Sequence, residues 1–190
     1  MVKNTTILTI GPLVIGAITL PIPDFSMVYM WVALALFVPV FLFAVYLDLT
    51  GKSKKSSKLR GYIGYFCLVL SSIYFALPAV KLYQDRPFIQ LVIIGIWIAA
   101  SFITFRYHRL MHAIVFAESD RYRKFTFLLH GTMGLALVAG AGGYYKAAEY
   151  FSYAFGPNAT FAYFSLILLI GSLWLGIFAQ STVGVFTKFK

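Results

Sequence analysis

The stretch from Ser26 to Leu47 reads SMVYMWVALALFVPVFLFAVYL and contains no charged residue. An α-helix needs roughly 20 apolar residues to cross the hydrocarbon core of a bilayer, which is about 30 Å thick, and this stretch is long enough. Its apolar residues are continuous rather than alternating with polar ones, and this pattern favours a helix over a half-buried strand. The stretch therefore predicts a transmembrane helix.

Five more apolar stretches of similar length lie along the chain. They cover about Thr5–Leu20, Gly61–Val80, Pro87–Phe105, Phe125–Tyr145 and Thr160–Phe186. The first is the shortest, and we interpret it as a retained helix because no small-residue cleavage site of a signal peptide follows it. The sequence thus predicts an all-α polytopic membrane protein with six transmembrane helices, in a single transmembrane domain over residues 1–190.

The composition supports this prediction. Hydrophobic residues make up 61% of the chain and charged residues 12%, whereas a soluble domain is nearer half apolar and a quarter charged. A chain of this composition could not cover a surface that faces water, so the lipid bilayer is expected to be part of its solvent. Cys67 is the only cysteine, which excludes a disulfide within the chain.

The positive charges are sorted strongly by the six-helix layout. Most of the basic residues fall on one side, namely Lys3, Lys52, Lys54, Lys55, Lys58, Arg60, Arg106, Arg109, Arg121, Arg123, Lys124, Lys188 and Lys190. Only Lys81, Arg86 and Lys146 fall on the other side. Basic loops usually remain in the cytoplasm, so we predict that both termini are cytoplasmic and that the protein lies in a plasma or inner membrane.

The predicted loop between the fourth and fifth helices, about Arg106 to Lys124, is the longest on the basic side. It contains the apolar run Ala113–Ala117 between two groups of basic residues. Alternation of this kind predicts a short helix at the membrane interface, or an extension of the fourth helix into the cytoplasm.

The three histidines are candidate ligands for a haem or a metal ion. His108 and His112 are four residues apart and share one face of a helix. His130 lies near the same side of the membrane, at the start of the fifth predicted helix. Neutral imidazole is a common metal ligand. The alternatives are a basic interfacial segment for His108 and His112, and a hydrogen bond between helices for His130.

A basic segment between the second and third helices is a candidate contact for anionic lipids or a cytoplasmic partner. It contains Lys52, Lys54, Lys55, Lys58 and Arg60. Basic residues next to a membrane helix attract anionic headgroups. The alternative is that they are a topology signal in a solvated loop. No aromatic platform or folded module accompanies the segment, so the sequence does not predict nucleic-acid binding.

Small residues recur at four-residue spacing in the last two predicted helices. They are Thr132, Ala136, Ala139, Gly140 and Gly143 in the fifth helix, and Ser172 and Gly176 in the sixth. Small residues let membrane helices approach closely, so these form a candidate packing face within the monomer or against another chain. The run from Gly140 to Gly143 also predicts a weak point in the fifth helix.

Three functional classes remain after these observations. Serine-hydrolase, zinc-protease and phosphate-loop motifs are missing from the sequence, which argues against an enzyme. The small extramembrane mass and the small-residue faces favour a non-catalytic subunit or accessory component of a larger membrane complex. The alternatives are a small transporter or substrate-binding membrane component for a neutral or apolar solute, and a membrane redox subunit that uses the histidines. No cofactor is assigned beyond the haem or metal hypothesis. The expected partners are the lipid bilayer and other membrane subunits or copies of the same chain.

Overall fold

A computed structural model describes residues 4–138 and 144–187, and these residues form helices and turns without a strand. The helices are η1 (Thr6–Thr9), α1 (Ile10–Thr19), α2 (Met27–Leu49), α3 (Lys52–Lys55), α4 (Ser57–Leu82), α5 (Pro87–Arg106), α6 (His108–Val115), η2 (Asp120–Tyr122), α7 (Arg123–Leu137), α8 (Tyr144–Phe155) and α9 (Pro157–Thr187). The predicted all-helical fold is confirmed for these residues.

Four of the described helices are long and apolar enough to cross a membrane: α2, α4, α5 and most of α9. The protein is therefore an integral membrane protein by the length and composition of its helices. The first predicted stretch forms the shorter apolar helix Thr6–Thr19. The fifth forms α7, which ends at Leu137 before the residues that lie outside the description. Six spans therefore stay a prediction, of which four are supported.

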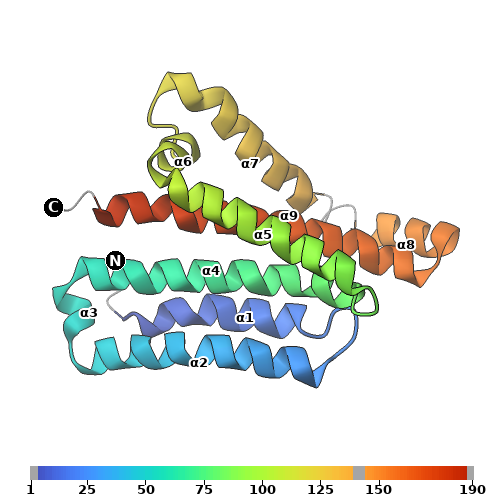
Figure 1. Cartoon of the computed structure of the whole chain (residues 1–190), viewed down its shortest axis with the longest axis horizontal. Helices are drawn as coiled ribbons and strands as arrows, with labels where there is room; N and C mark the ends of the chain where they lie inside the picture. Colours follow the sequence, from blue (N-terminus) through green and yellow to red (C-terminus); the bar gives the residue numbers. More distant parts are fainter. Residues whose placement is uncertain (1–3, 139–143, 188–190) are drawn as a thin grey trace.

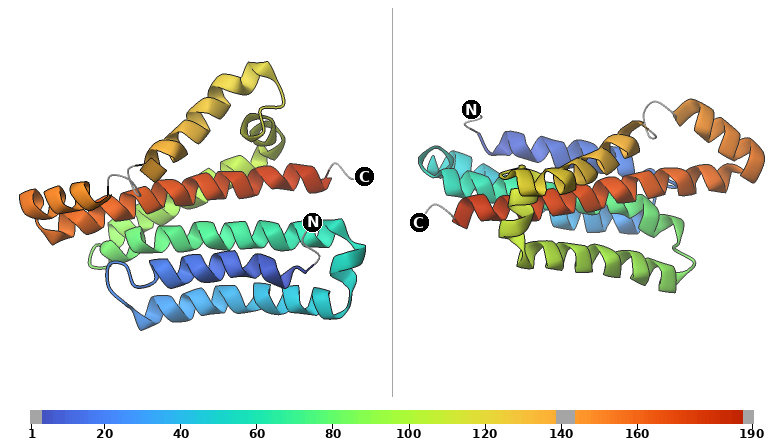
Figure 2. Two further views of the ribbon diagram at one scale, coloured as in Figure 1. Left: turned by 180° about the vertical axis from the view of Figure 1, so that it is seen from behind. Right: turned by 90° about the horizontal axis from the view of Figure 1, so that it is seen from above.

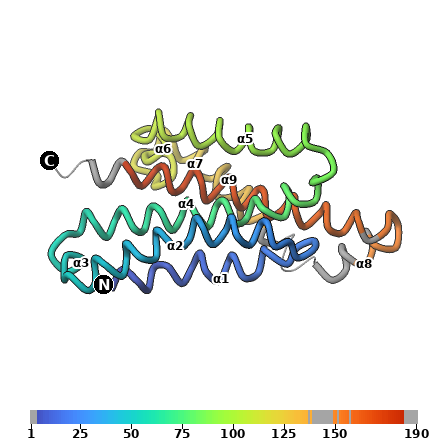
Figure 3. Tube along the Cα trace, turned by 60° about the horizontal axis from the view of Figure 1, so that its bottom comes forward, coloured from blue at the N-terminus to red at the C-terminus, as the bar shows by residue number. Residues whose placement is uncertain are grey.

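The pair formed by α4 and α9 is the centre of the bundle. Figure 1 shows α1 and α2 on one side of this pair and α5, α6 and α7 on the other. The tube in Figure 3 shows the same order from another direction, with α4 between the α1–α2 pair and α9. The bundle core therefore depends on two helices whose sequences are about a hundred residues apart.

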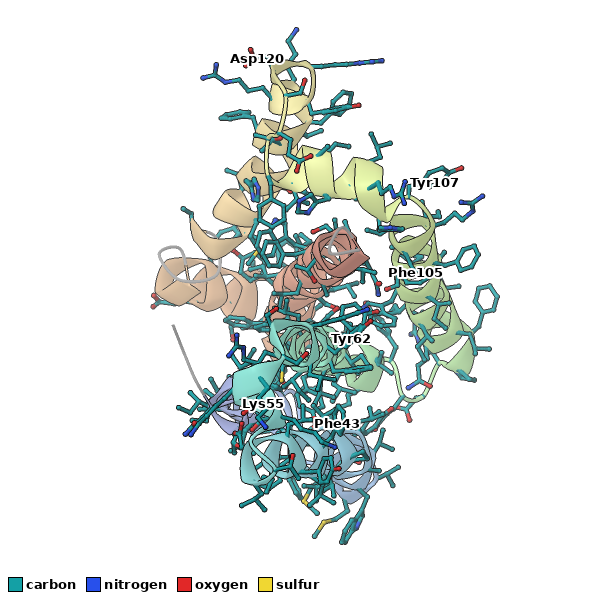
Figure 4. The ribbon with its side chains drawn as sticks, turned by 90° about the vertical axis from the view of Figure 1, so that its left-hand side faces the viewer. Phe43, Lys55, Tyr62, Phe105, Tyr107 and Asp120 are labelled. Atoms are coloured by element: carbon teal, nitrogen blue, oxygen red, sulfur yellow. The ribbon has the colours of Figure 1, made fainter. Side chains whose placement is uncertain are left out.

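The two ends of the bundle differ in charge. Figure 1 shows η1, α3, α6 and the last turns of α9 toward one end, which we call the basic end because it carries the basic segments around residues 52–60 and 106–124. The α1–α2 turn, the α4–α5 turn and α8 lie at the other, which we call the neutral end. Figure 4 looks onto the basic end, with Asp120 in η2 at the top of the view and Lys55 on α3 in the lower half.

Local sequence explains where several helices begin and end. Gly51 and Gly156 adopt φ angles of +66° and +84° just after α2 and α8, in the left-handed region that favours glycine. Pro87 and Pro157 begin α5 and α9, where a missing N–H costs nothing. The Ser56 side chain accepts a hydrogen bond from Leu59 N at 3.3 Å and caps α4.

Two regions expected as loops contain helices. Residues of the basic segment form the single turn α3, and the aromatic stretch before Pro157 forms α8. Both are short, and apolar length alone could not reveal them. A short helix does occur in the predicted fourth loop, as α6, and its location at the membrane interface stays a prediction.

The N-terminal segment is fastened to the basic end of α2 by Asp48. One carboxylate oxygen accepts hydrogen bonds from Thr5 N and Thr5 Oγ1, and the other from Thr6 N and Thr6 Oγ1, at 2.7–2.9 Å. These bonds satisfy N–H groups at the start of a helix that would otherwise lack partners. Farther along α1, Gly16 packs on the Tyr74 ring of α4, where an added Cβ would lie 3.0 Å from a ring carbon.

Candidate functional site

An apolar groove separates α7 from α9. Views from two sides in Figure 2 show α7 running at an angle to α9 rather than alongside it. The groove has a volume of about 590 Å³ and is lined by Leu129, Thr132, Leu135 and Ala136 of α7 and by Tyr163, Leu166, Ile167, Ile170, Leu173, Trp174 and Ile177 of α9. The α9 residues recur every three or four positions, so they form one face of the helix.

The groove continues toward the neutral end between α8 and α9. A second hollow of about 560 Å³ is lined by Tyr83, Phe155, Ala159 and Ala162, together with Tyr163 and Leu166. Tyr163 and Leu166 also line the first hollow. The two apolar hollows are therefore parts of one surface along α9.

A polar basin follows at the neutral end. It has a volume of about 520 Å³ and is lined by Pro23, Asp24, Lys81, Leu82, Tyr83, Gln84, Asp85, Arg86, Asn158, Phe161 and Ala162. Tyr83 and Ala162 belong to both the basin and the second hollow. Turns from the α1–α2 and α4–α5 connections thus meet the start of α9 around a charged depression.

Basin and groove together form one amphipathic path along α9. From Asn158 to Ile177 the helix rises about 28 Å, which approaches the thickness of the bilayer hydrocarbon core. The charged groups are confined to one end of this path, and the lining of the rest is almost entirely apolar. A long molecule with one polar end matches this arrangement, because ligand sites are concave, mostly apolar and equipped with a few polar groups.

The three histidines make separate contacts with the backbone. His108 Nδ1 lies 3.0 Å from Phe105 O, His112 Nδ1 lies 3.2 Å from Ser181 O, and His130 Nε2 lies 3.0 Å from Val115 O. His112 Nε2 also lies 3.2 Å from a Glu118 carboxylate oxygen. Among the described residues, no three His, Cys, Asp or Glu side chains are grouped so that they could hold a metal ion.

Two of these contacts hold α6 in place. The Thr126 hydroxyl donates to Ile114 O, and His130 meets the next carbonyl, Val115 O. The carbonyl groups in the last turn of a helix lack hydrogen-bond donors within that helix. Thr126 and His130 of α7 therefore serve as hydrogen-bond partners for the last carbonyls of α6. His112 connects α6 to α9 at Ser181. The arrangement explains His112 and His130 as supports of α6, and the haem or metal hypothesis has no contact in its favour here.

The basic segment extends from α3 into the first turn of α4. Lys52 Nζ donates to Tyr46 OH at 3.0 Å and lies 5.1 Å from the centre of that ring. Lys54, Lys55 and Lys58 are exposed, and Arg60 is half-buried. The exposed ammonium groups can meet lipid headgroups or water alike, so the contact predicted for this segment stays a prediction.

The candidate packing residues fall into two groups. Ser172 and Gly176 meet α4: Ser72 Oγ donates to Ser172 O at 2.7 Å, and Ser172 Oγ donates to Ser72 O at 2.6 Å. Gly176 lies against Ser72, where an added Cβ would come within 3.1 Å of Oγ. Thr132 and Ala136 line the groove instead. Ala139, Gly140 and Gly143, with the predicted weak point, lie outside the described residues.

Neither Lys81 nor the groove was predicted from the sequence as part of a site. Lys81 was predicted to lie just beyond the third apolar stretch, whereas its side chain is buried at 3% exposure. A basic residue just inside the end of an apolar helix was the available signal, because such a side chain needs buried partners or water. The groove had no comparable signal, since its α9 face resembles any other apolar helix face.

Comparison of the chain with protein-family models, curated proteins and solved structures gives no match.

Proposed function

We propose that this protein is a membrane component that binds one amphipathic, lipid-like molecule along α9. The observation that carries the proposal is the continuity of the charged basin with the apolar groove through Tyr83, Ala162, Tyr163 and Leu166. This function belongs to the class of substrate-binding membrane components for apolar solutes.

The physical basis differs between the two parts of the site. Lipid tails already lie in an apolar solvent, so the groove gains little from the hydrophobic effect. It selects a tail by close packing against the large side chains of α7 and α9, since many small dispersion contacts add up. The basin can hold a polar end by directed hydrogen bonds, which the surrounding hydrocarbon cannot offer.

Leu166 provides the test, because it lines both apolar hollows and is 58% exposed. Leu166→Trp places a bulky ring in the path. We expect the purified variant to retain about tenfold less co-purified lipid than the wild-type protein, because overfilling a packed site costs about 1–3 kcal/mol. Native mass spectrometry of the protein in mild detergent measures the retained mass.

The matched control is Leu91→Trp on α5, where Leu91 is 68% exposed and lines none of the three parts of the path. This variant is expected to retain lipid as the wild-type protein does. Equal retention in the wild type and in Leu166→Trp would contradict the proposed function.

Membership of a larger complex and a redox role stay predictions of the sequence. The same purification addresses both: stoichiometric companion chains in the mass spectrum support a complex subunit, and a Soret band in the absorbance spectrum supports haem. Neither result conflicts with lipid binding along α9.

We also propose that the basic end faces the cytoplasm, on the strength of the charge difference between the ends of the bundle. In a Cys67→Ser background, Ser56→Cys should react with a membrane-impermeant thiol reagent only from the cytoplasmic side. Asn158→Cys should react only from the opposite side. Labelling of both variants from one side would contradict this orientation.

A further inference from the structure

Lys81 brings a buried positive charge to the basin. Its Nζ donates to Leu20 O at 2.6 Å and to Ile22 O at 2.9 Å, and these contacts hold the end of α1 against α4. An ammonium group has three N–H donors, and the two carbonyls accept two of them. The third donor is available on a side chain that lines the basin.

The charge of Lys81 lacks a contacting carboxylate. Within the part of the chain that the structure describes, no carboxylate oxygen lies within 4 Å of Lys81 Nζ, and Asp24 of the same basin attracts this charge only over a longer distance. Burial of a charge is costly unless an opposite charge or strong hydrogen bonds compensate it. The two carbonyls and the attraction of Asp24 compensate part of this cost, and an anionic group in the basin would add a direct ionic contact at the third N–H.

The other charged side chains of the basin complete the pattern. Arg86 adds a second positive group, and Asp24 and Asp85 add two negative ones. The basin is therefore neutral in total but contains both signs. A ligand that carries one anionic and one cationic group can match both, whereas a purely anionic ligand meets the two carboxylates unfavourably.

We infer that the molecule bound along α9 is a zwitterionic phospholipid, with its phosphate held by Lys81 and Arg86 and its amine facing Asp24 and Asp85. This inference rests on the proposed function, because it names the headgroup of the same site. The tail follows the apolar path that leaves the basin between Tyr83 and Ala162.

The test compares headgroups on the delipidated full-length protein in detergent. Phosphatidylethanolamine and phosphatidylglycerol with identical acyl chains are added separately, and native mass spectrometry measures binding of one lipid per chain. We expect phosphatidylethanolamine to bind about tenfold more tightly than phosphatidylglycerol. Its amine adds one charge-assisted interaction with the carboxylates of the basin, which is enough for this difference. Equal affinity for the two lipids would overturn the inference.

Two variants test the assigned phosphate contacts. Lys81→Met and Arg86→Gln should each weaken phosphatidylethanolamine binding by about tenfold. Because Lys81 also holds the end of α1, Arg86→Gln decides the result if Lys81→Met melts at a lower temperature. Lys124→Met, at the basic end, removes the same charge and should bind as the wild type does. Unchanged binding in Arg86→Gln would overturn the assignment.

A soluble headgroup separates the lipid from a free phosphate compound. Phosphoethanolamine at millimolar concentration should leave the bound lipid in place, because it lacks the tail; displacement would overturn the lipid as the occupant. Failure of the proposed function has a different signature. In that case the wild-type protein binds neither lipid. If only the headgroup inference fails, the wild-type protein binds both lipids equally and Leu166→Trp still binds neither.

Discussion

The two sides of α9 pack against their neighbours differently: the side toward α4 forms a close contact, and the side toward α7 leaves an open groove. Toward α4, small residues allow close approach, and Ser72 and Ser172 exchange hydrogen bonds with each other's carbonyls. Toward α7, large side chains such as Leu166 and Ile170 line an open groove. The comparison teaches that side-chain size decides whether two apolar helices form a closed contact or leave space for a ligand.

The contact between α9 and α4 also uses a third helix. The Trp97 indole of α5 donates to Ser72 Oγ at 2.9 Å, and Gln180 of α9 accepts a hydrogen bond from Tyr65 OH at 2.9 Å. Ser72, Ser172 and Gln180 thus have protein partners in this contact. On the groove side, by contrast, Thr132 donates to Leu129 O within its own helix rather than to α9.

Enlarging residues on the two sides should therefore have unequal effects, and the largest is expected at Gly176. Gly176→Leu would push α9 away from Ser72, because even a Cβ there lies 3.1 Å from Oγ. We expect the free energy of unfolding to fall by about 2–3 kcal/mol. Thr132→Leu, on the groove side, should change it by less than about 0.5 kcal/mol. Thermal unfolding in detergent measures both variants, and equal losses would break the comparison.

A smaller effect is expected where α7 is attached. His130 of α7 contacts Val115 O at the end of α6, so His130→Ala should release the last turn of α6. The expected loss of unfolding free energy is about 1 kcal/mol. Hydrogen exchange should rise over His108–Val115 and stay unchanged in α4. An unaltered exchange rate in α6 would show that His130 has a different role. So would a Soret band that is present in the wild-type spectrum and missing from the spectrum of His130→Ala.

The sequence by itself determined the class of protein and the longest helices. The apolar stretches near Ser26–Leu47, Gly61–Val80, Pro87–Phe105 and Thr160–Phe186 correspond to α2, α4, α5 and α9. These features were predictable because transfer of a side chain into hydrocarbon depends on that side chain and a window of neighbours about 20 residues long. The concentration of basic residues toward one end was predictable from the order of these helices, because each helix decides on which side of the membrane the next loop lies.

The tertiary structure alone decided where the site lies. The groove depends on the angle between α7 and α9, and the basin depends on two turns that meet the start of α9 near Lys81. Small residues looked equivalent in the sequence, yet Ser172 and Gly176 pack on α4 while Thr132 and Ala136 line the groove. Contacts such as the one between Ser72 and Ser172 join residues a hundred positions apart. Which apolar faces meet is decided by the fit of whole helices, and no local window of the sequence contains that information.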